Sequence, residues 1–296
     1  MIPPTSIDGT DITGATIDGT DVTEITVDGD VVFSAGAVSG THYYSIQGQS
    51  TGEVEYFSLA TPFDLPNKGS PDFTLQYSLI RVNNMSISND GTTFYVVEDE
   101  RVSNTNKTVE EFSLSTPFDL QSAQSQGTFA PPFAPIGFAR TCFDFADDET
   151  RFYTNDGNGN MVQFDLSTPF DPTTGTQSGS LGPFASSGPG SPSFSPDGTQ
   201  MAFGQRAGST IRGGTLSTPF DISTFTQTDT FTTSDADPCS VRWNSDGTTL
   251  YVRHASPNMV NEFSTPNPYS INGLSFVQQV FANPNFAVGH DFNYNY

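Results

Sequence analysis

Hydrophobic and polar residues alternate in many short stretches of this chain, and this alternation predicts β-strands. Four such stretches follow a short polar turn: "SNDGTTFYV" from Ser88, "ADDETRFYT" from Ala146, "SPDGTQMAF" from Ser195 and "NSDGTTLYV" from Asn244. An Asp-Gly pair supplies the positive φ that a tight turn between two strands requires. Each stretch therefore predicts a β-hairpin.

A second motif interleaves with these hairpins. It reads "FSLATPFDL" from Phe57, "FSLSTPFDL" from Phe112, "FDLSTPFDP" from Phe164 and "TLSTPFDIS" from Thr215. A degenerate fifth copy, "FSTPNPYSI", contains Pro266, and successive motif prolines are 47 to 55 residues apart. This spacing is about the length of one propeller blade, roughly 40 to 50 residues.

The two motifs together predict the order of strands in the repeat. Each unit reads as an inner strand, an Asp-Gly hairpin, a second strand, a third strand, a TPFD corner and a polar outer strand, which is a four-stranded blade. Five sets of second to outer strands begin near Thr41, Thr92, Thr150, Thr199 and Thr248. The first set lacks an inner strand, and the C-terminal segment 288–294 supplies one. We therefore predict an all-β, five-bladed β-propeller over residues 39–296, closed by pairing of its N- and C-terminal strands.

The recurring corner has its own chemistry. Proline fixes φ, Thr or Asp can hydrogen-bond to nearby backbone amides, and phenylalanine offers a large apolar ring. We expect the corner phenylalanines to pack under the turn or between blades. They are Phe63, Phe118, Phe170 and Phe220.

The N-terminal segment, residues 1–38, follows a different pattern. An Ile-Asp-Gly or Val-Asp-Gly triplet recurs at a step of ten residues, which predicts short strands joined by tight turns. The triplets are Ile7, Asp8, Gly9, Ile17, Asp18, Gly19, Val27, Asp28 and Gly29. So small a piece cannot bury enough apolar surface alone. We expect it to be an attachment or oligomerisation segment, which makes the protein a homo-oligomer; the alternative is an extended arm along the propeller.

Composition limits the possible partners. The chain has 33 acidic and 10 basic residues and a net charge of −23, which would repel nucleic acid. Such a surface suits concentrated salt, and hence a halophilic or marine source, although an ordinary acidic protein is the alternative. We find neither a signal peptide nor the roughly 18 apolar residues of a membrane span. Cys142 and Cys239 are predicted to be buried thiols.

Few residues suggest catalysis. Asp144 and Asp291 lie on predicted inner strands, with His290 beside Asp291, and could serve a glycoside hydrolase that acts on envelope polysaccharide. The other conspicuous aspartates occupy hairpin turns, where their structural role is sufficient. His42 and His254 have no metal-site spacing, so we expect no metal, no cofactor and no enzymatic activity. Five loops between second and third strands form the predicted recognition surface: 47–52, 98–108, 155–160, 205–209 and 255–258.

The "DGTDVTEITVDGDVVF" segment followed by "LSTPFDL" units resembles structural proteins of tailed viruses of haloarchaea or marine bacteria. The resemblance implies a non-enzymatic virion protein, located in the virion as a tail fibre, spike or capsid decoration. It also implies that the N-terminus binds other virion proteins, while the propeller contacts the particle or a host-surface glycan or glycoprotein. A cellular scaffold propeller is a further alternative.

Overall fold

The computed structural model describes most of the propeller region and parts of the N-terminal segment. The described residues are 16–17, 20–21, 24–27, 30–34, 41–47, 53–77, 82–98, 108–129, 142–156, 158–184, 188–205, 208–256, 258–282 and 290–292. Within these residues, the helices are short 3-10 turns, and none is long and apolar enough to cross a membrane.

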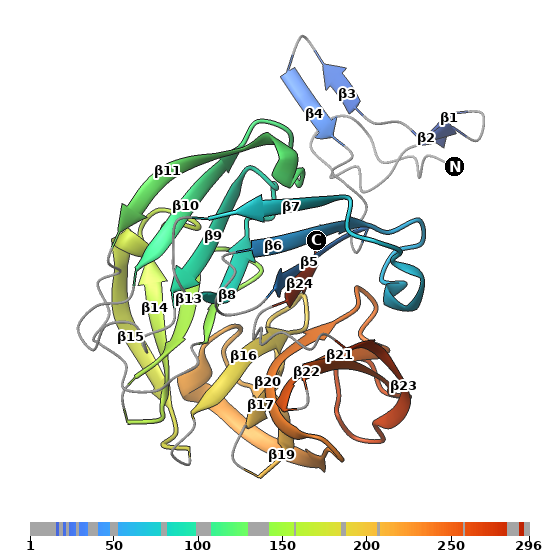
Figure 1. The fold of residues 1–296 in the computed structure, drawn as a ribbon. Helices are drawn as coiled ribbons and strands as arrows, with labels where there is room; N and C mark the ends of the chain where they lie inside the picture. The colour runs from blue at the N-terminus through green and yellow to red at the C-terminus, as the bar shows by residue number, and fades with distance from the viewer. Residues whose placement is uncertain are drawn as a thin grey trace.

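The fold is all-β and propeller-like, as predicted, and consists of antiparallel four-stranded units (Figure 1). Each unit runs from a first strand, which contacts the first strands of other units, to an outer strand. Unit 1 is β24 (His290–Phe292), β5 (His42–Gln47), β6 (Glu53–Ser58) and β7 (Phe73–Gln76). Unit 2 is β8 (Val82–Ile87), β9 (Thr93–Glu98), β10 (Val109–Leu114) and β11 (Ala123–Phe129). Unit 3 is β12 (Phe143–Phe145), β13 (Arg151–Asn155), β14 (Met161–Leu166) and β15 (Gly175–Leu181).

The last two units form one eight-stranded sheet. Unit 4 is β16 (Pro189–Phe194), β17 (Gln200–Gln205), β18 (Thr210–Leu216) and β19 (Phe225–Thr232). Unit 5 is β20 (Ala236–Trp243), β21 (Thr249–Ser256), β22 (Asn258–Ser264) and β23 (Ser275–Ala282). A single parallel bridge between Ser191 and Ser240 joins their first strands. The first strands therefore meet along the middle of the molecule.

The first and last strands of the propeller region pair with each other. β24 runs antiparallel to β5, with His290 opposite Ser45 and Asp291 opposite Tyr44. The C-terminal strand thus supplies the first strand of the unit that begins the propeller, which is the pairing the sequence predicts.

The TPFD corners have one backbone conformation in every unit. Their aromatic residues have φ of 57° to 64°, in the left-handed region, and the unit 5 corner uses Tyr269 in place of phenylalanine. Phe63, Phe118, Phe170 and Phe220 are all buried. In units 2 to 4 the aspartate that follows accepts a hydrogen bond from the amide two residues on and caps a 3-10 turn.

Tyrosines on second strands connect neighbouring units. The hydroxyl of Tyr44 in unit 1 donates to the carbonyl of Phe118 in unit 2, at 2.8 Å. Tyr153 in unit 3 donates to the carbonyl of Phe220 in unit 4, at 2.6 Å, and Tyr251 in unit 5 donates to the carbonyl of Phe63 in unit 1. The core clusters likewise combine residues of adjacent units. The corners of units 1, 2 and 4 therefore each receive a hydrogen bond from the preceding unit.

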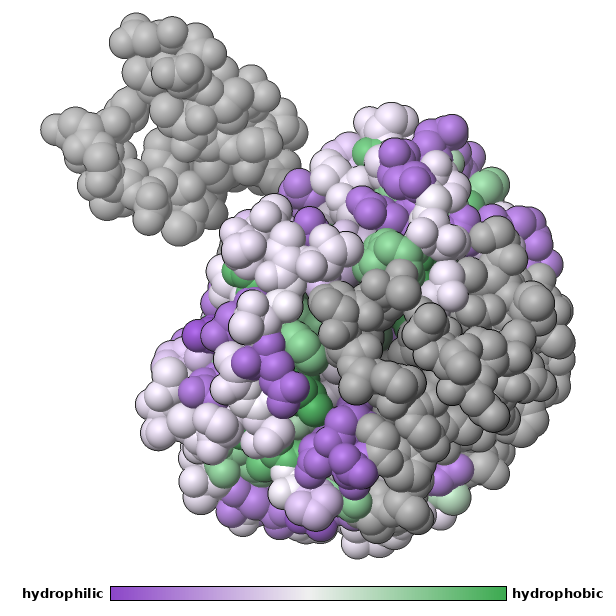
Figure 2. Space-filling model, turned by 90° about the vertical axis from the view of Figure 1, so that its left-hand side faces the viewer, coloured by the Kyte–Doolittle hydropathy of each residue, from purple (hydrophilic) through white to green (hydrophobic). Residues whose placement is uncertain are grey.

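The described surface is mainly polar on one face, and the two thiols are buried. Hydrophilic and weakly polar residues cover most of the described surface on the face in Figure 2, and hydrophobic residues appear in a few recessed bands. Cys142 and Cys239 are buried thiols, which confirms the prediction.

The N-terminal segment is described only in part. β1 (Thr16–Ile17) pairs with β2 (Thr20–Asp21), and β3 (Glu24–Val27) pairs with β4 (Asp30–Ser34). Ile17 and Val27 lie in β1 and β3. The other predicted docking residues fall outside the described residues: Ile7, Asp8, Gly9, Asp18, Gly19, Asp28 and Gly29.

Candidate functional site

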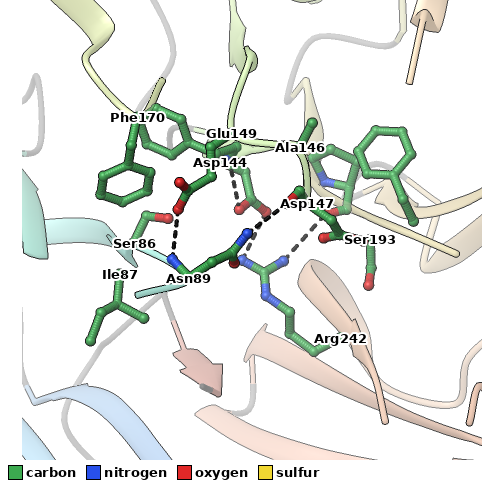
Figure 3. A pocket seen from close by; sticks show the side chains of 13 residues that line it. Ser86, Ile87, Asn89, Asp144, Ala146, Asp147, Glu149, Phe170, Ser193 and Arg242 are labelled. Carbon is green, nitrogen blue, oxygen red and sulfur yellow. Dashed lines mark hydrogen bonds and ion pairs between the residues drawn. The ribbon is translucent and has the colours of Figure 1, made fainter. Parts of the chain in front are cut away.

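A pocket lies where the first strands of units 2, 3 and 4 end and turn into their hairpins (Figure 3). Its cavity volume is about 50 Å³, and the cavity opens to solvent. Its wall combines apolar rings with carboxylates, hydroxyls, an amide and one guanidinium group. A concave site with a few convergent polar groups is the usual form of a ligand pocket.

One register position of the first strands supplies several polar groups of the pocket. Ser86, Asp144, Ser193 and Arg242 occupy it in units 2 to 5, each directly before an aromatic or aliphatic residue. Their backbones pair with Tyr95, Tyr153, Ala202 and Tyr251 of the second strands. Asp291 has the same register position in unit 1, opposite Tyr44, and its side chain lies outside what the structure describes. Two units thus carry serine where units 3 and 5 carry opposite charges.

These two charges meet inside the molecule. Nη2 of Arg242 lies 2.7 Å from Oδ2 of Asp144, and 5% of the arginine side chain and 10% of the aspartate side chain are exposed. Nη1 of Arg242 also donates to the carbonyl oxygens of Pro192, at 3.2 Å, and Val241, at 3.0 Å. A single arginine therefore connects units 3, 4 and 5 at the floor of the pocket.

A second polar contact lies one step deeper along the same strands. The Asn84 side chain of unit 2 donates to the Ser191 hydroxyl of unit 4, at 2.9 Å, and both residues are buried. Because this bond joins first strands of non-adjacent units, it spans the space between them. This bond therefore ties unit 2 to unit 4 near the pocket.

Glu149 departs from the repeat. In units 2, 4 and 5 the equivalent turn residue is Gly91, Gly198 or Gly247, with φ of 69°, 66° and 71°. A Cβ atom at each of these glycines would lie 2.5 Å from the ring of the corner aromatic residue. Glu149 holds the same type of turn at φ 54° with a full side chain. A non-glycine residue in this region costs on the order of 1 kcal/mol or more, and such strain concentrates at functional sites.

The Glu149 carboxylate lies in the pocket between units 2 and 3. Its Oε1 accepts a hydrogen bond from the backbone amide of Asn89, at 2.6 Å. The side-chain amide of Asn89 donates to the backbone carbonyl of Asp147, at 2.5 Å (Figure 3). Burial raises the pKa of Glu149, the charges of Asp90 and Asp148 raise it further, and the hydrogen bond from Asn89 partly offsets them. A carboxyl group with a raised pKa in a cleft is a candidate functional group.

Aromatic rings line the pocket beside Glu149 (Figure 3). The Phe170 ring lies 4.2 Å from that of Phe145 and 5.1 Å from that of Tyr95, between centroids. Together with the carboxylates, the Asn89 amide and the serine hydroxyls, these rings can hold a small polar ligand that has an apolar face. Within the described residues, no group of three His, Cys, Asp or Glu side chains could hold a metal ion.

The candidate residues from the sequence lie in different surroundings. Asp144 lies at the pocket, but its partner is Arg242. His42 is hydrogen-bonded to Tyr56, and His254 is buried with Nδ1 against the Ala236 carbonyl, so neither lies in the pocket. The turn aspartates Asp90, Asp148, Asp197 and Asp246 each accept a hydrogen bond from the amide two residues on, which is a structural role.

Sequence reasoning missed Glu149 and Arg242. The detectable signal was the departure of each from its repeat: glutamate in an Asp-Gly turn, and arginine at a position that holds serine or aspartate in the other units. The pocket also lies at the hairpin and corner end of the strands. Each of the five predicted recognition loops falls partly outside the described residues, and the described ends of the second and third strands that flank them lie at the other end of the units.

The comparisons with known proteins concern the fold. No protein-family model and no curated protein significantly matches this chain. The periplasmic gluconolactonase of Pseudomonas aeruginosa is similar in structure, with a TM-score of 0.55, 13% identity, and coverage of 83% of this chain and 81% of that chain. A candidate 6-phosphogluconolactonase from Bacteroides uniformis has a TM-score of 0.53, 15% identity, and coverage of 80% and 82%. At these identities the likeness shows a propeller fold.

The resemblance to structural proteins of tailed viruses is wrong. These similar solved structures are bacterial lactonase propellers and not virion proteins. The physical reason is that the TPFD corner and the Asp-Gly hairpin are solutions to turning a strand within a propeller unit, and any propeller can use them.

Proposed function

We propose that this chain is a non-enzymatic structural and binding protein, in which a five-bladed propeller recognises a carbohydrate group in the pocket beside Glu149. The five four-stranded units are taken as the five blades, with β24 closing the ring. In this proposal the N-terminal segment 1–38 holds the propeller to a larger assembly. A few side chains on a rigid scaffold then recognise the ligand.

The observation that carries the proposal is Glu149. Three other units use glycine at this turn, and glutamate there accepts backbone strain while directing a carboxylate into the pocket. Carboxylates, amides and hydroxyls suit sugar hydroxyl groups, and an aromatic ring suits the apolar face of a sugar. Binding is favoured over catalysis because Asp144, the acid predicted for hydrolysis, is buried against Arg242.

The test is a glycan array containing neutral, amino and acidic glycans, followed by calorimetry with any glycan that binds. Glu149→Gly restores the residue of the other units, so it should keep the fold and lose binding. Asp229→Asn on outer strand β19 changes the charge equally outside the pocket and should bind as the natural chain does. Binding by no glycan, or full binding by Glu149→Gly, contradicts the proposal.

A second candidate is hydrolysis of a sugar lactone. The raised pKa of Glu149 favours it, because a general base works best with a pKa nearer neutrality. In this reaction the Glu149 carboxylate takes a proton from water while the hydroxide adds to the lactone carbonyl. The ring C–O bond then breaks, Glu149 returns the proton to the departing ring oxygen, and the new carboxylic acid ionises to release a proton. Proton release from δ-gluconolactone in a pH-stat, abolished by Glu149→Gln, would support it; equal release by the natural chain and buffer would exclude that substrate.

Localisation in the virion stays a prediction without the family resemblance behind it. Immunogold electron microscopy with antibody against residues 41–296 tests it on a culture of the source organism. Label on particles would support the virion, and label confined to cells would contradict it.

A further inference from the structure

The charged groups on the pocket wall are mostly negative. Among the described residues that line the pocket, the carboxylates of Asp144, Asp147 and Glu149 accompany a single basic group, the guanidinium of Arg242. Asp144 binds this guanidinium at 2.7 Å, and two backbone carbonyl oxygens accept from it as well. The chain itself thus neutralises Arg242, and the described wall keeps an excess of negative charge.

The surroundings of Glu149 have the same sign. Burial raises the pKa of Glu149, and the charges of Asp90 and Asp148 raise it further. A positive charge bound beside Glu149 would favour its ionised form and lower this pKa again. By linkage, ionised Glu149 favours a cationic ligand over a neutral or anionic one.

Two groups of the pocket have unused hydrogen-bonding capacity. Among the described residues, Asn89 is the one donor to the Glu149 carboxylate, which leaves the second oxygen, Oε2, available. The Ser86 side chain also lines the pocket (Figure 3). Ser86 is only 3% exposed, and its hydroxyl has no hydrogen-bond partner in the described part of the chain. A buried polar group without a partner is costly, so Ser86 points to a ligand group that binds here.

A small organic cation suits these groups better than a metal ion does. Ca²⁺ takes six to eight oxygen ligands, whereas the described residues include no group of three side chains able to hold a metal. An ammonium group has three N–H donors and needs only acceptors. A cavity of about 50 Å³ has room for one such group, and the rest of the ligand would lie at the opening. The rings of Phe145 and Phe170 also line the pocket, and aromatic faces attract cations.

We propose that the pocket selects a sugar that carries a protonated amine, and that its ammonium group donates hydrogen bonds to the Glu149 carboxylate and the Ser86 hydroxyl. This inference rests on the proposed carbohydrate recognition and specifies the class of sugar. A hydroxyl group in the same place forms a weaker, uncharged hydrogen bond. A carboxylate or phosphate there meets like charges, which oppose binding.

Calorimetry of the full chain with matched methyl glucosides tests the inference at neutral pH. One series carries an amine, a hydroxyl or a carboxylate at carbon 6, and a second pair carries an amine or a hydroxyl at carbon 2. We expect the amino sugar of at least one series to bind about tenfold or more tightly than its hydroxyl counterpart, and the carboxylate to bind most weakly. Each sugar carries a single charge, which limits general attraction to the acidic surface.

Variants locate the cation. Glu149→Gln keeps the size of the side chain and one acceptor oxygen but removes the charge, so it should lower the ratio of amine to hydroxyl affinity about tenfold. Ser86→Ala should weaken binding of the amino sugar about tenfold, because one acceptor is lost. Asp229→Asn on β19 removes an equal charge outside the pocket and should keep the ratio. The ratio is taken within each protein, so partial unfolding does not change it.

Three results would overturn the inference. Amino sugars that bind no more tightly than their hydroxyl counterparts in both series would refute it and leave carbohydrate recognition intact. An amine preference that Glu149→Gln retains in full would refute it too, because the cation would then bind elsewhere on the acidic surface. Binding by none of these sugars or those of the glycan array would refute the proposed function and this inference with it.

Discussion

Asp144 and Arg242 illustrate how single residues specialise a repeated position. The position faces the space between units, and serine occupies it in units 2 and 4 without bearing charge. A charge buried in a protein without a partner costs on the order of several kcal/mol. The aspartate and the arginine are therefore dependent on each other.

This dependence gives the first prediction. Asp144→Asn or Arg242→Met alone should lower the free energy of unfolding by about 3–5 kcal/mol, because each leaves the other charge buried and unpaired. The double variant should lose less than the sum of the two. Urea denaturation of all four proteins measures the coupling.

The exposed pair between Arg151 and Asp165 serves as the control. Its atoms are 3.6 Å apart and 56% of the aspartate side chain is exposed, so Asp165→Ala should cost less than about 1 kcal/mol. Additive losses for Asp144 and Arg242 would show that the two charges do not stabilise each other.

Glu149 should make the stability of the fold depend on pH. Its pKa is raised in the folded chain, so folding favours its protonated form. The folded chain then binds more protons than the unfolded chain between the ordinary and the raised pKa, and stability falls as pH rises through that range. Glu149→Gln should lack this loss.

Denaturant midpoints measured from pH 4 to neutrality, for the natural chain and Glu149→Gln, check the sign, since an ordinary glutamate pKa is about 4.3. The difference between the two proteins should grow with pH in favour of glutamine. A difference that shrinks as pH rises would show that the hydrogen bond from Asn89 dominates.

At the scale of elements, the corner joins one unit to the next. A second-strand tyrosine donates to the carbonyl of the following corner in three places, and the bond from Tyr251 to Phe63 joins unit 5 to unit 1. The left-handed φ of the corner aromatic residue presents that carbonyl at the interface. One local conformation thus serves both the turn and the contact between units.

Removing one of these hydroxyls should therefore destabilise the whole chain. Tyr153→Phe and Tyr251→Phe should each cost about 1–3 kcal/mol, because a buried carbonyl loses its donor. Thermal and urea denaturation measure the loss. Gln126→Ala removes an exposed hydrogen bond to Ser113 and should change stability by less than about 0.5 kcal/mol. Equal effects in all three variants would contradict a special role for the tyrosines.

At the scale of the whole molecule, charge opposes compactness. The whole chain carries a net charge of −23, and the resulting repulsion is relieved when the chain unfolds and expands. We therefore expect the free energy of unfolding in urea to rise between about 0.1 M and about 1 M NaCl, as the Debye length falls from about 10 Å to about 3 Å. Sucrose at matched osmolality serves as the uncharged control. Equal stability at both salt concentrations would show that repulsion is not limiting.

The amino-acid sequence by itself determined the strands, the order of strands within a unit and the pairing of the C-terminal strand with the first unit. These features depend on neighbours in sequence: Asp-Gly turns, alternating strands, TPFD corners and a count of strands that leaves one unpaired at each end. The same turn motifs led to the wrong family resemblance. A corner motif reflects local backbone geometry, and it does not show common ancestry.

Only the tertiary structure decided which residues meet between units. Nothing near Asp144 in sequence indicates Arg242, because their contact depends on which first strands face each other and on how far each side chain reaches. Likewise, the Glu149 side chain lies in the pocket because it bonds to the backbone amide of Asn89 in unit 2. Turn chemistry is local and can be read from a few residues, whereas a site formed by several units is a property of their packing.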